Sequence, residues 1–131
     1  MASHYLFDTH ALIFWYLKKS VSEEFVEFFD EQVDNGNVSV SSVSFWEIAL
    51  PSKKGRIDID NVELWKSDLT ENTKIRIINP EASEMIASVY LPDIHKDPFD
   101  RLLIVQANSH NAALVTKDEF IEEYPVETFW I

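Results

Sequence analysis

Apolar positions along the chain follow two spacings. Short apolar or β-branched runs, which are typical of strands, occur at HYLF (4–7), VSVSSV (38–43), KIRII (74–78), AALVT (112–116) and VETFW (126–130). Segments with apolar residues three or four positions apart, which indicate helices, are ALIFWYL (11–17), SEEFVEFFDEQV (22–33), SFWEIAL (44–50), NVELWKSDLTEN (61–72), PEASEMIASVY (80–90), DPFDRLLIVQANSHN (97–111) and KDEFIEEY (117–124). The chain is therefore expected to alternate strands and helices.

Proline and glycine set several of the expected boundaries. The sequence Asn35-Gly36-Asn37 separates the second helix from the second strand. Pro51 is expected to end the helix of residues 44–50, and Pro80 to begin the helix of residues 80–90. Short strands that alternate with helices favour an α/β fold with a mainly parallel sheet covered on both faces.

Length and composition indicate one domain over residues 1–131. The chain has 131 residues, of which 46% are hydrophobic, and this is enough for one real core. It has no cysteine, which excludes disulfides and thiolate zinc sites. Because we find neither a signal-peptide pattern nor an apolar run of membrane-spanning length, we expect a cytoplasmic protein without membrane contact.

The formal net charge of −12 opposes unspecific attraction to nucleic acid. It does not exclude a nucleic-acid function, because bound divalent cations or a basic partner reverse the sign locally.

Four acids follow or lie close to the expected strand ends, namely Asp8, Glu47, Asp100 and Asp118. Each one alone has a structural explanation as a helix cap: Asp8 before a helix, Ser44 with Glu47 as a capping box, and Asp118 before the last helix. In HKDPFDR (95–101), Asp97 is expected as the N-cap, Pro98 as the first helical residue and Asp100 as the third.

Together, the four acids are harder to explain by capping. A parallel sheet brings its strand ends to one edge, where four carboxylates would repel one another. Two unit charges 4 Å apart cost about 1 kcal/mol in water and about 4 kcal/mol at an effective dielectric of 20. Either protons or a cation must reduce this repulsion, and carboxylate oxygens suit Mg²⁺ or Mn²⁺. Such ions can activate water and stabilise the attacking and leaving oxygens when a phosphodiester is cleaved. The pattern therefore indicates a metal-dependent nuclease.

From residue 4 to about 130, the chain resembles the PIN-domain ribonucleases, and among them the toxins of VapC type. FDTHALIFW is similar to the first strand and acid of that family, and SFWEIAL to its second acid. The third acid of the family has its counterpart in HKDPFDRLLIVQA, and the fourth acid and last strand have theirs in LVTKDEFIEEYPVETFW. The resemblance implies a three-layer α/β/α fold with a central sheet of about five strands.

The resemblance also implies an endoribonuclease that uses Mg²⁺ or Mn²⁺ and acts as the toxin of a toxin–antitoxin pair. Asp8, Glu47, Asp100 and Asp118 would be the catalytic acids. Asp8 and Asp100 would be the direct metal ligands, while Glu47 and Asp118 would position a water or a second ion. The implied partners are an RNA substrate, a cognate antitoxin protein and a second copy of the chain in a homodimer.

Further residues beside the acids are candidates for supporting roles. Thr9, Asp97 and Thr116 could orient the acids or a water, although each also suits a capping role. The basic residues that could contact RNA phosphate are Lys53, Lys54, Arg56, Arg101 and Lys117. The sequence Leu50-Pro51-Ser52 departs from the family pattern, because it shortens the expected helix after Glu47.

Two other functions are compatible with this pattern. A receiver-type phospho-acceptor domain also has a doubly wound sheet and binds Mg²⁺ at strand ends, but it needs an acidic pair after the first strand, and FDTH supplies one acid. A catalytically silent binding module could keep the fold and pair with a regulator through the aromatic residues of the first two helices.

Overall fold

The computed structural model describes residues 3–131 and contains a five-stranded sheet in which every neighbouring pair of strands is parallel. The strands are β1 (Tyr5–Phe7), β2 (Val38–Ser41), β3 (Arg76–Ile78), β4 (Ala113–Val115) and β5 (Thr128–Phe129). The helices are α1 (Thr9–Leu17), α2 (Glu23–Asp34), α3 (Ser42–Lys53), α4 (Val62–Asn72), α5 (Ala82–Val89) and α6 (Pro98–Ser109), and a 3₁₀ turn, η1, spans Ile121–Glu123. The expected α/β fold is confirmed.

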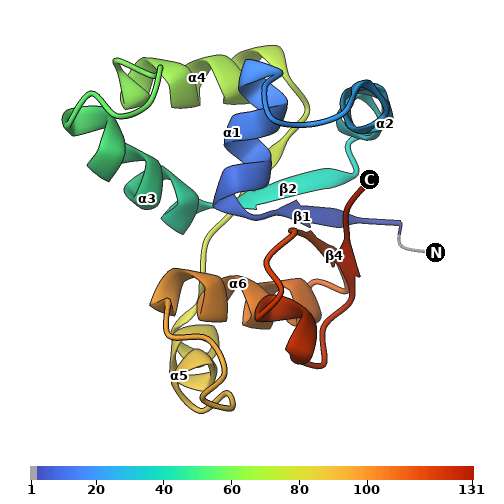
Figure 1. Ribbon diagram of the computed structural model, residues 1–131, viewed down its shortest axis with the longest axis vertical. Coiled ribbons are helices and arrows are strands. Elements are labelled where there is room, and N and C mark those ends of the chain that lie inside the picture. The colour runs from blue at the N-terminus through green and yellow to red at the C-terminus, as the bar shows by residue number, and fades with distance from the viewer. Residues whose placement is uncertain (1–2) are drawn as a thin grey trace.

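Helices cover both faces of the sheet, which gives three layers (Figure 1). On one face, Tyr5 and Phe7 pack in a core with residues of α1, α2, α3 and α4. On the other face, Leu6 packs with Leu103 and Ile104 of α6. Because successive side chains of a strand point to opposite faces, the fully apolar strand YLF contributes side chains to both cores.

The order of the strands is β3-β2-β1-β4-β5, so the direction of winding changes between β1 and β4. In open α/β sheets, ligands bind beyond the carboxyl ends of the strands at this switch point. Asp8 follows β1, and Thr116, Lys117 and Asp118 follow β4. The receiver-type alternative requires the order 2-1-3-4-5, so the observed topology rules it out.

Three expected helix boundaries are wrong. Helix α3 passes through Pro51 to Lys53. A proline in the last turn removes one backbone hydrogen bond but does not end the helix. The helix after Glu47 is therefore not shortened. Helix α5 begins at Ala82, because Glu81 and Glu84 form a capping box that excludes Pro80 from the helix. Residues 117–124 contain only the turn η1.

Among the described residues, no helix is long and apolar enough to cross a membrane.

Candidate metal centre

Asp8 lies at the carboxyl end of the central strand β1 and caps helix α1. Its Oδ1 accepts a hydrogen bond of 2.7 Å from the backbone N–H of Ala11, as expected for an N-cap. The residue is 6% exposed. Burial raises the pKa of Asp8, and the hydrogen bond from Ala11 opposes this shift. A hydrogen bond from the Thr116 side chain also lowers the pKa of this carboxyl.

Asp100 lies in the first turn of α6, which begins as the sequence indicates. Asp97 is the N-cap and accepts a hydrogen bond of 2.8 Å from the N–H of Phe99, while Pro98 is the first helical residue. Asp100, Asp8 and Asp118 line one cavity of about 310 Å³, together with His10, Phe14, Lys117 and Trp130. The structure thus brings three of the four expected acids to one cavity.

Glu47 is held at this edge by Thr9. The Thr9 hydroxyl donates to Glu47 Oε1 at 2.6 Å and lies 3.0 Å from the Ser44 hydroxyl. Burial raises the pKa of Glu47, while the hydrogen bond from Thr9 lowers it. The expected capping box is wrong, because Ser41 caps α3 and Ser44 is buried inside the helix. Glu47 therefore lies beyond the first turn, on the helical face that meets Thr9.

Asp118 lies after β4 and is fixed by several hydrogen bonds. Its Oδ1 accepts from the N–H groups of Phe120 and Ile121, and its own N–H donates to the Thr116 hydroxyl at 3.1 Å. Burial opposes ionisation of Asp118, but these bonds and one from the His95 ring outweigh it and hold its pKa below the ordinary value. Thr116 is 1% exposed, so it cannot contact a substrate directly and can act only by positioning the groups to which it is hydrogen-bonded, such as Asp118.

The acids interact strongly enough to require a positive charge or a proton. Burial, followed by the charges of Asp97, Glu47 and Asp8, raises the pKa of Asp100 from 3.8 to about 7. A divalent cation would remove this repulsion, and hard oxygen donors suit Mg²⁺ or Mn²⁺. The oxygen donors of these acids therefore fit such an ion.

Without metal, Asp100 should make the protein less stable as the pH rises. The carboxyl has a pKa of about 7 when folded and 3.8 as its ordinary value, so the folded state binds more protons between these limits. The contribution of Asp100 to stability is then greatest below the lower value and falls towards the upper one, by at most about 1.4 kcal/mol per pH unit for one proton. Urea unfolding in a chelator should show this decline for the wild type and a flatter profile for Asp100→Asn. Equal profiles would contradict the shifted pKa.

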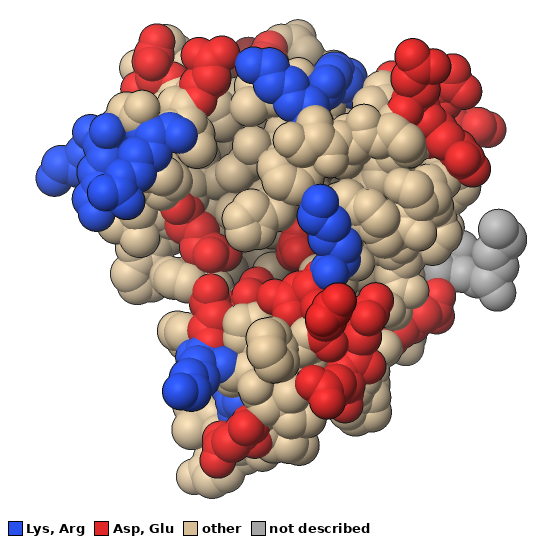
Figure 2. Space-filling model, in the orientation of Figure 1, with Lys and Arg blue, Asp and Glu red and all other residues tan. Residues whose placement is uncertain are grey.

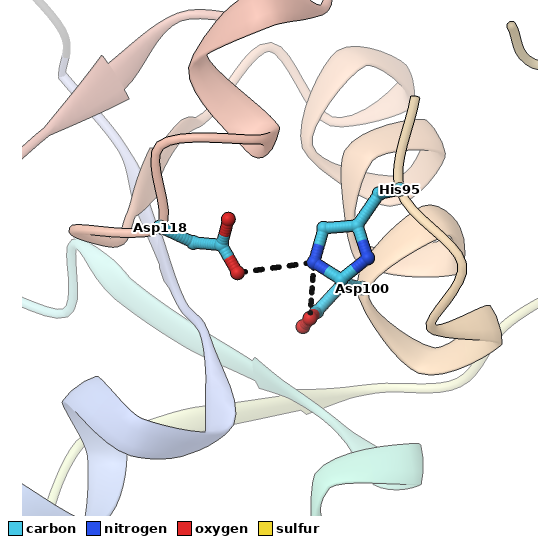
Figure 3. Close-up of side chains that lie close together, drawn as sticks. All are labelled: His95, Asp100 and Asp118. Carbon is cyan, nitrogen blue, oxygen red and sulfur yellow. Dashed lines mark hydrogen bonds and ion pairs between the residues drawn. The ribbon is translucent and has the colours of Figure 1, made fainter. Parts of the chain in front are cut away.

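His95 is a site residue that we did not predict. Its Nε2 lies 3.0 Å from Asp118 Oδ2 and 3.0 Å from Asp100 Oδ2 (Figure 3). The three residues each offer one ligand atom, all within 4.8 Å of one another. The signal in the sequence is its place in HKDPFDR, two residues before the N-cap, where the loop can turn a side chain back over the helix start.

Arg101 lies inside the protein, where it cannot contact RNA as we expected. The residue is 8% exposed. Its guanidinium donates to the carbonyl oxygens of Ser88, Val89, Leu91, Pro92 and His95 and to the Tyr124 hydroxyl, at 2.7 to 3.3 Å. These bonds use all its N–H groups and fix the loop between α5 and α6. We therefore do not propose an RNA contact for this residue.

The other basic candidates are exposed at two places. Lys53, Lys54 and Arg56 lie at the end of α3 and in the turn that follows. Lys117 lies at the cavity, with its Nζ 5.4 Å from the ring centres of both Phe14 and Trp130. Figure 2 shows basic atoms gathered over the far end of α3 and acidic atoms around the central hollow.

Residues 5–127 match the PIN domain family, and the chain belongs to this family. The match contains all the acids described above and every strand except β5.

Solved structures with a similar fold include a toxin–antitoxin complex and a VapBC protein bound to DNA. VapBC2 from Rickettsia felis, bound to a promoter DNA fragment, is 18% identical with a TM-score of 0.72, and 95% of each chain is covered. FitAcB from Neisseria gonorrhoeae is 16% identical with a TM-score of 0.69, over 95% of this chain and 96% of that one. A toxin–antitoxin complex from Klebsiella pneumoniae is 20% identical with a TM-score of 0.65, over 92% of each chain. No match was found among curated proteins.

Proposed function

We propose that this protein is a Mg²⁺- or Mn²⁺-dependent endoribonuclease and the toxin of a toxin–antitoxin pair. The observation that carries the proposal is the cavity at the switch point of a PIN-domain sheet, where Asp8, Asp100 and Asp118 meet. Burial, followed by the charges of Asp97, Glu47 and Asp8, raises the pKa of Asp100, and this supports a cation as part of the working site.

In this proposal, Asp8 and Asp100 hold the ion. When bound, the ion supplies Lewis acidity, which activates water and stabilises charge on the phosphodiester. Glu47 is positioned by the Thr9 hydroxyl and has a raised pKa, and a more basic carboxylate is better suited to accept a proton. Asp118 is held as a carboxylate by its hydrogen bonds and completes the negative edge of the cavity.

The cavity wall that carries Lys117 fits a nucleotide. Phe14 and Trp130 offer aromatic surface on which a base can stack, and Lys117 between them offers a charge for phosphate. Lys53, Lys54 and Arg56 offer a second place for phosphate at the end of α3. An RNA that spans both places would pass along the acidic cavity.

Lys117→Met should weaken RNA binding about three- to tenfold and lower the salt dependence by the equivalent of one phosphate contact. Lys74→Met, at an exposed lysine outside both basic places, is the matched control and should leave the affinity unchanged. Fluorescence anisotropy with a short RNA at several salt concentrations measures both quantities. If the two variants behaved alike, Lys117 would have no place in the RNA path.

We further propose a cognate antitoxin protein and a second copy of the chain as partners, in the cytoplasm. Support comes from the structural neighbours, one of which is a toxin–antitoxin complex from Klebsiella pneumoniae, and another VapBC2 from Rickettsia felis bound to a promoter DNA fragment. The net charge of −12 also favours a partner with a basic segment.

The proposed activity is tested by incubating the purified protein with structured RNAs in Mn²⁺, in Mg²⁺ and in a chelator. We expect metal-dependent cleavage by the wild type and none by Asp8→Asn. Metal binding without cleavage of any RNA would instead favour the catalytically silent binding module.

A further inference from the structure

The His95 imidazole lies in the gap between two acids of the site. It comes from the loop before α6, while Asp100 comes from α6 itself and Asp118 from the loop after β4 (Figure 3). One ring nitrogen, Nε2, is 3.0 Å from an oxygen of each acid. The side chain of His95 is 13% exposed, so water has little access to this gap.

The second ring nitrogen determines where the ring carries its hydrogen. Nδ1 lies 3.0 Å from the backbone nitrogen of Asp97 and accepts a hydrogen bond from its N–H. An imidazole nitrogen that accepts cannot also carry a hydrogen, so the hydrogen of the neutral ring lies on Nε2. His95 therefore presents an N–H group, and not a lone pair, to Asp100 and Asp118.

The backbone around His95 is fixed, so the ring cannot easily leave this position. The Tyr124 hydroxyl accepts hydrogen bonds from the N–H groups of Ile94 (3.1 Å) and His95 (2.7 Å). Arg101 donates to the His95 carbonyl at 3.1 Å. Two buried side chains from other elements thus hold both ends of the His95 peptide.

We propose that His95 takes the place of a second cation between Asp100 and Asp118 and so limits the site to one metal ion. The inference rests on the proposed function, because it assumes that Asp8 and Asp100 hold a divalent ion. A donor N–H offsets part of the charge of the two carboxylates, as a cation would, and it fills the gap that a second ion would need. His95 is then a positioning residue that determines the number of ions.

The same three residues could instead form a metal site with His95 as a ligand, since their ligand atoms lie within 4.8 Å of one another. That arrangement needs a lone pair on Nε2 and therefore a hydrogen on Nδ1. The hydrogen would point at the N–H of Asp97, only 3.0 Å away, and break the bond found there. The geometry thus favours the donor over the ligand.

Counting bound Mn²⁺ separates the two roles without measuring activity. Electron paramagnetic resonance of free Mn²⁺, with calorimetry as a second method, should give one ion per chain for the wild type. His95→Ala should bind two ions, because the gap opens. His95→Gln should bind one, because its amide N–H can replace the Nε2 donor. His110→Ala, a histidine that faces Glu84 instead, is the matched control and should bind one.

Other results would overturn the proposal in distinguishable ways. If His95→Ala lost its bound Mn²⁺ or bound it more weakly, His95 would be a metal ligand. If the wild type bound two ions, His95 would not exclude the second ion. Either result leaves the proposed nuclease intact. No binding by the wild type would overturn the proposed function as well.

The tautomer can be tested in the wild type alone, so the proposal does not depend on whether a variant folds. Nitrogen-15 chemical shifts of the metal-free protein should show Nε2 protonated and Nδ1 unprotonated for His95. The opposite tautomer would contradict the proposal.

Discussion

Asp100→Asn is expected to lower the rate of metal-dependent RNA cleavage by on the order of 10²- to 10³-fold, the usual loss when a preorganised charged group of a transition state is removed. Asparagine keeps the shape of the side chain and its place in the first turn of α6, but it loses the negative charge that would hold the ion. It also removes a negative charge that burial and the neighbouring acids disfavour, so the folded protein should not become less stable near neutral pH. Single-turnover cleavage at saturating Mn²⁺ measures this loss.

Asp97→Asn is the matched control for this change. Asp97 lies three residues earlier and caps α6, a role that asparagine fills equally well. The control should therefore keep most of the activity, although its charge is one of those that act on Asp100. An equal loss in both variants, or full activity of Asp100→Asn, would contradict the assignment of Asp100 as a metal ligand.

Arg101→Met is expected to lower the free energy of unfolding by on the order of 3 kcal/mol, because it removes several hydrogen bonds that a charged group donates. Methionine fills part of the volume but donates no hydrogen bond. Five carbonyl groups between Ser88 and His95 then lose the hydrogen bond from the guanidinium, and of these the Pro92 carbonyl keeps its bonds from Tyr124 and Ile94. Urea unfolding monitored by tryptophan fluorescence measures the change.

Two further variants show whether the network causes this loss. Arg101→Lys has fewer donors and a different geometry, so it should recover only part of the stability. Arg76→Met removes an arginine at an exposed position of β3 and should change stability by less than about 0.5 kcal/mol. If Arg101→Met were as mild as Arg76→Met, the guanidinium would not hold the loop between α5 and α6.

Much of the fold could be predicted because the local signals agree with the tertiary structure. All five strands occur where apolar runs indicate them, and α6 begins with Asp97 and Pro98 as expected. The wrong boundaries arise where two local rules compete. At Pro80, the capping box of Glu81 and Glu84 begins the helix later, and at Pro51 a proline in the last turn costs the helix little.

The candidate site was predicted less completely, because it depends on contacts between distant segments. Asp8 and Asp118 could be named because each follows a strand, and Asp100 because it opens a helix, and sheet topology brings such positions together. Glu47 was named from a first-turn position that it does not have. The role of His95 depends on a loop that Tyr124 fixes from 29 residues away. Arg101 resembles an RNA contact in sequence, but the loop between α5 and α6 folds over it and takes its donors.

The most direct test of the central claim is cleavage of an RNA whose scissile phosphate carries sulfur in place of a non-bridging oxygen. Mg²⁺ binds sulfur poorly and Mn²⁺ accepts it more readily, because Mg²⁺ is the harder ion. If an ion at Asp8 and Asp100 contacts the reacting phosphate, sulfur should slow cleavage in Mg²⁺, and Mn²⁺ should restore much of the rate. Cleavage of the unmodified RNA at the same rate in a chelator as in Mg²⁺ would contradict the account.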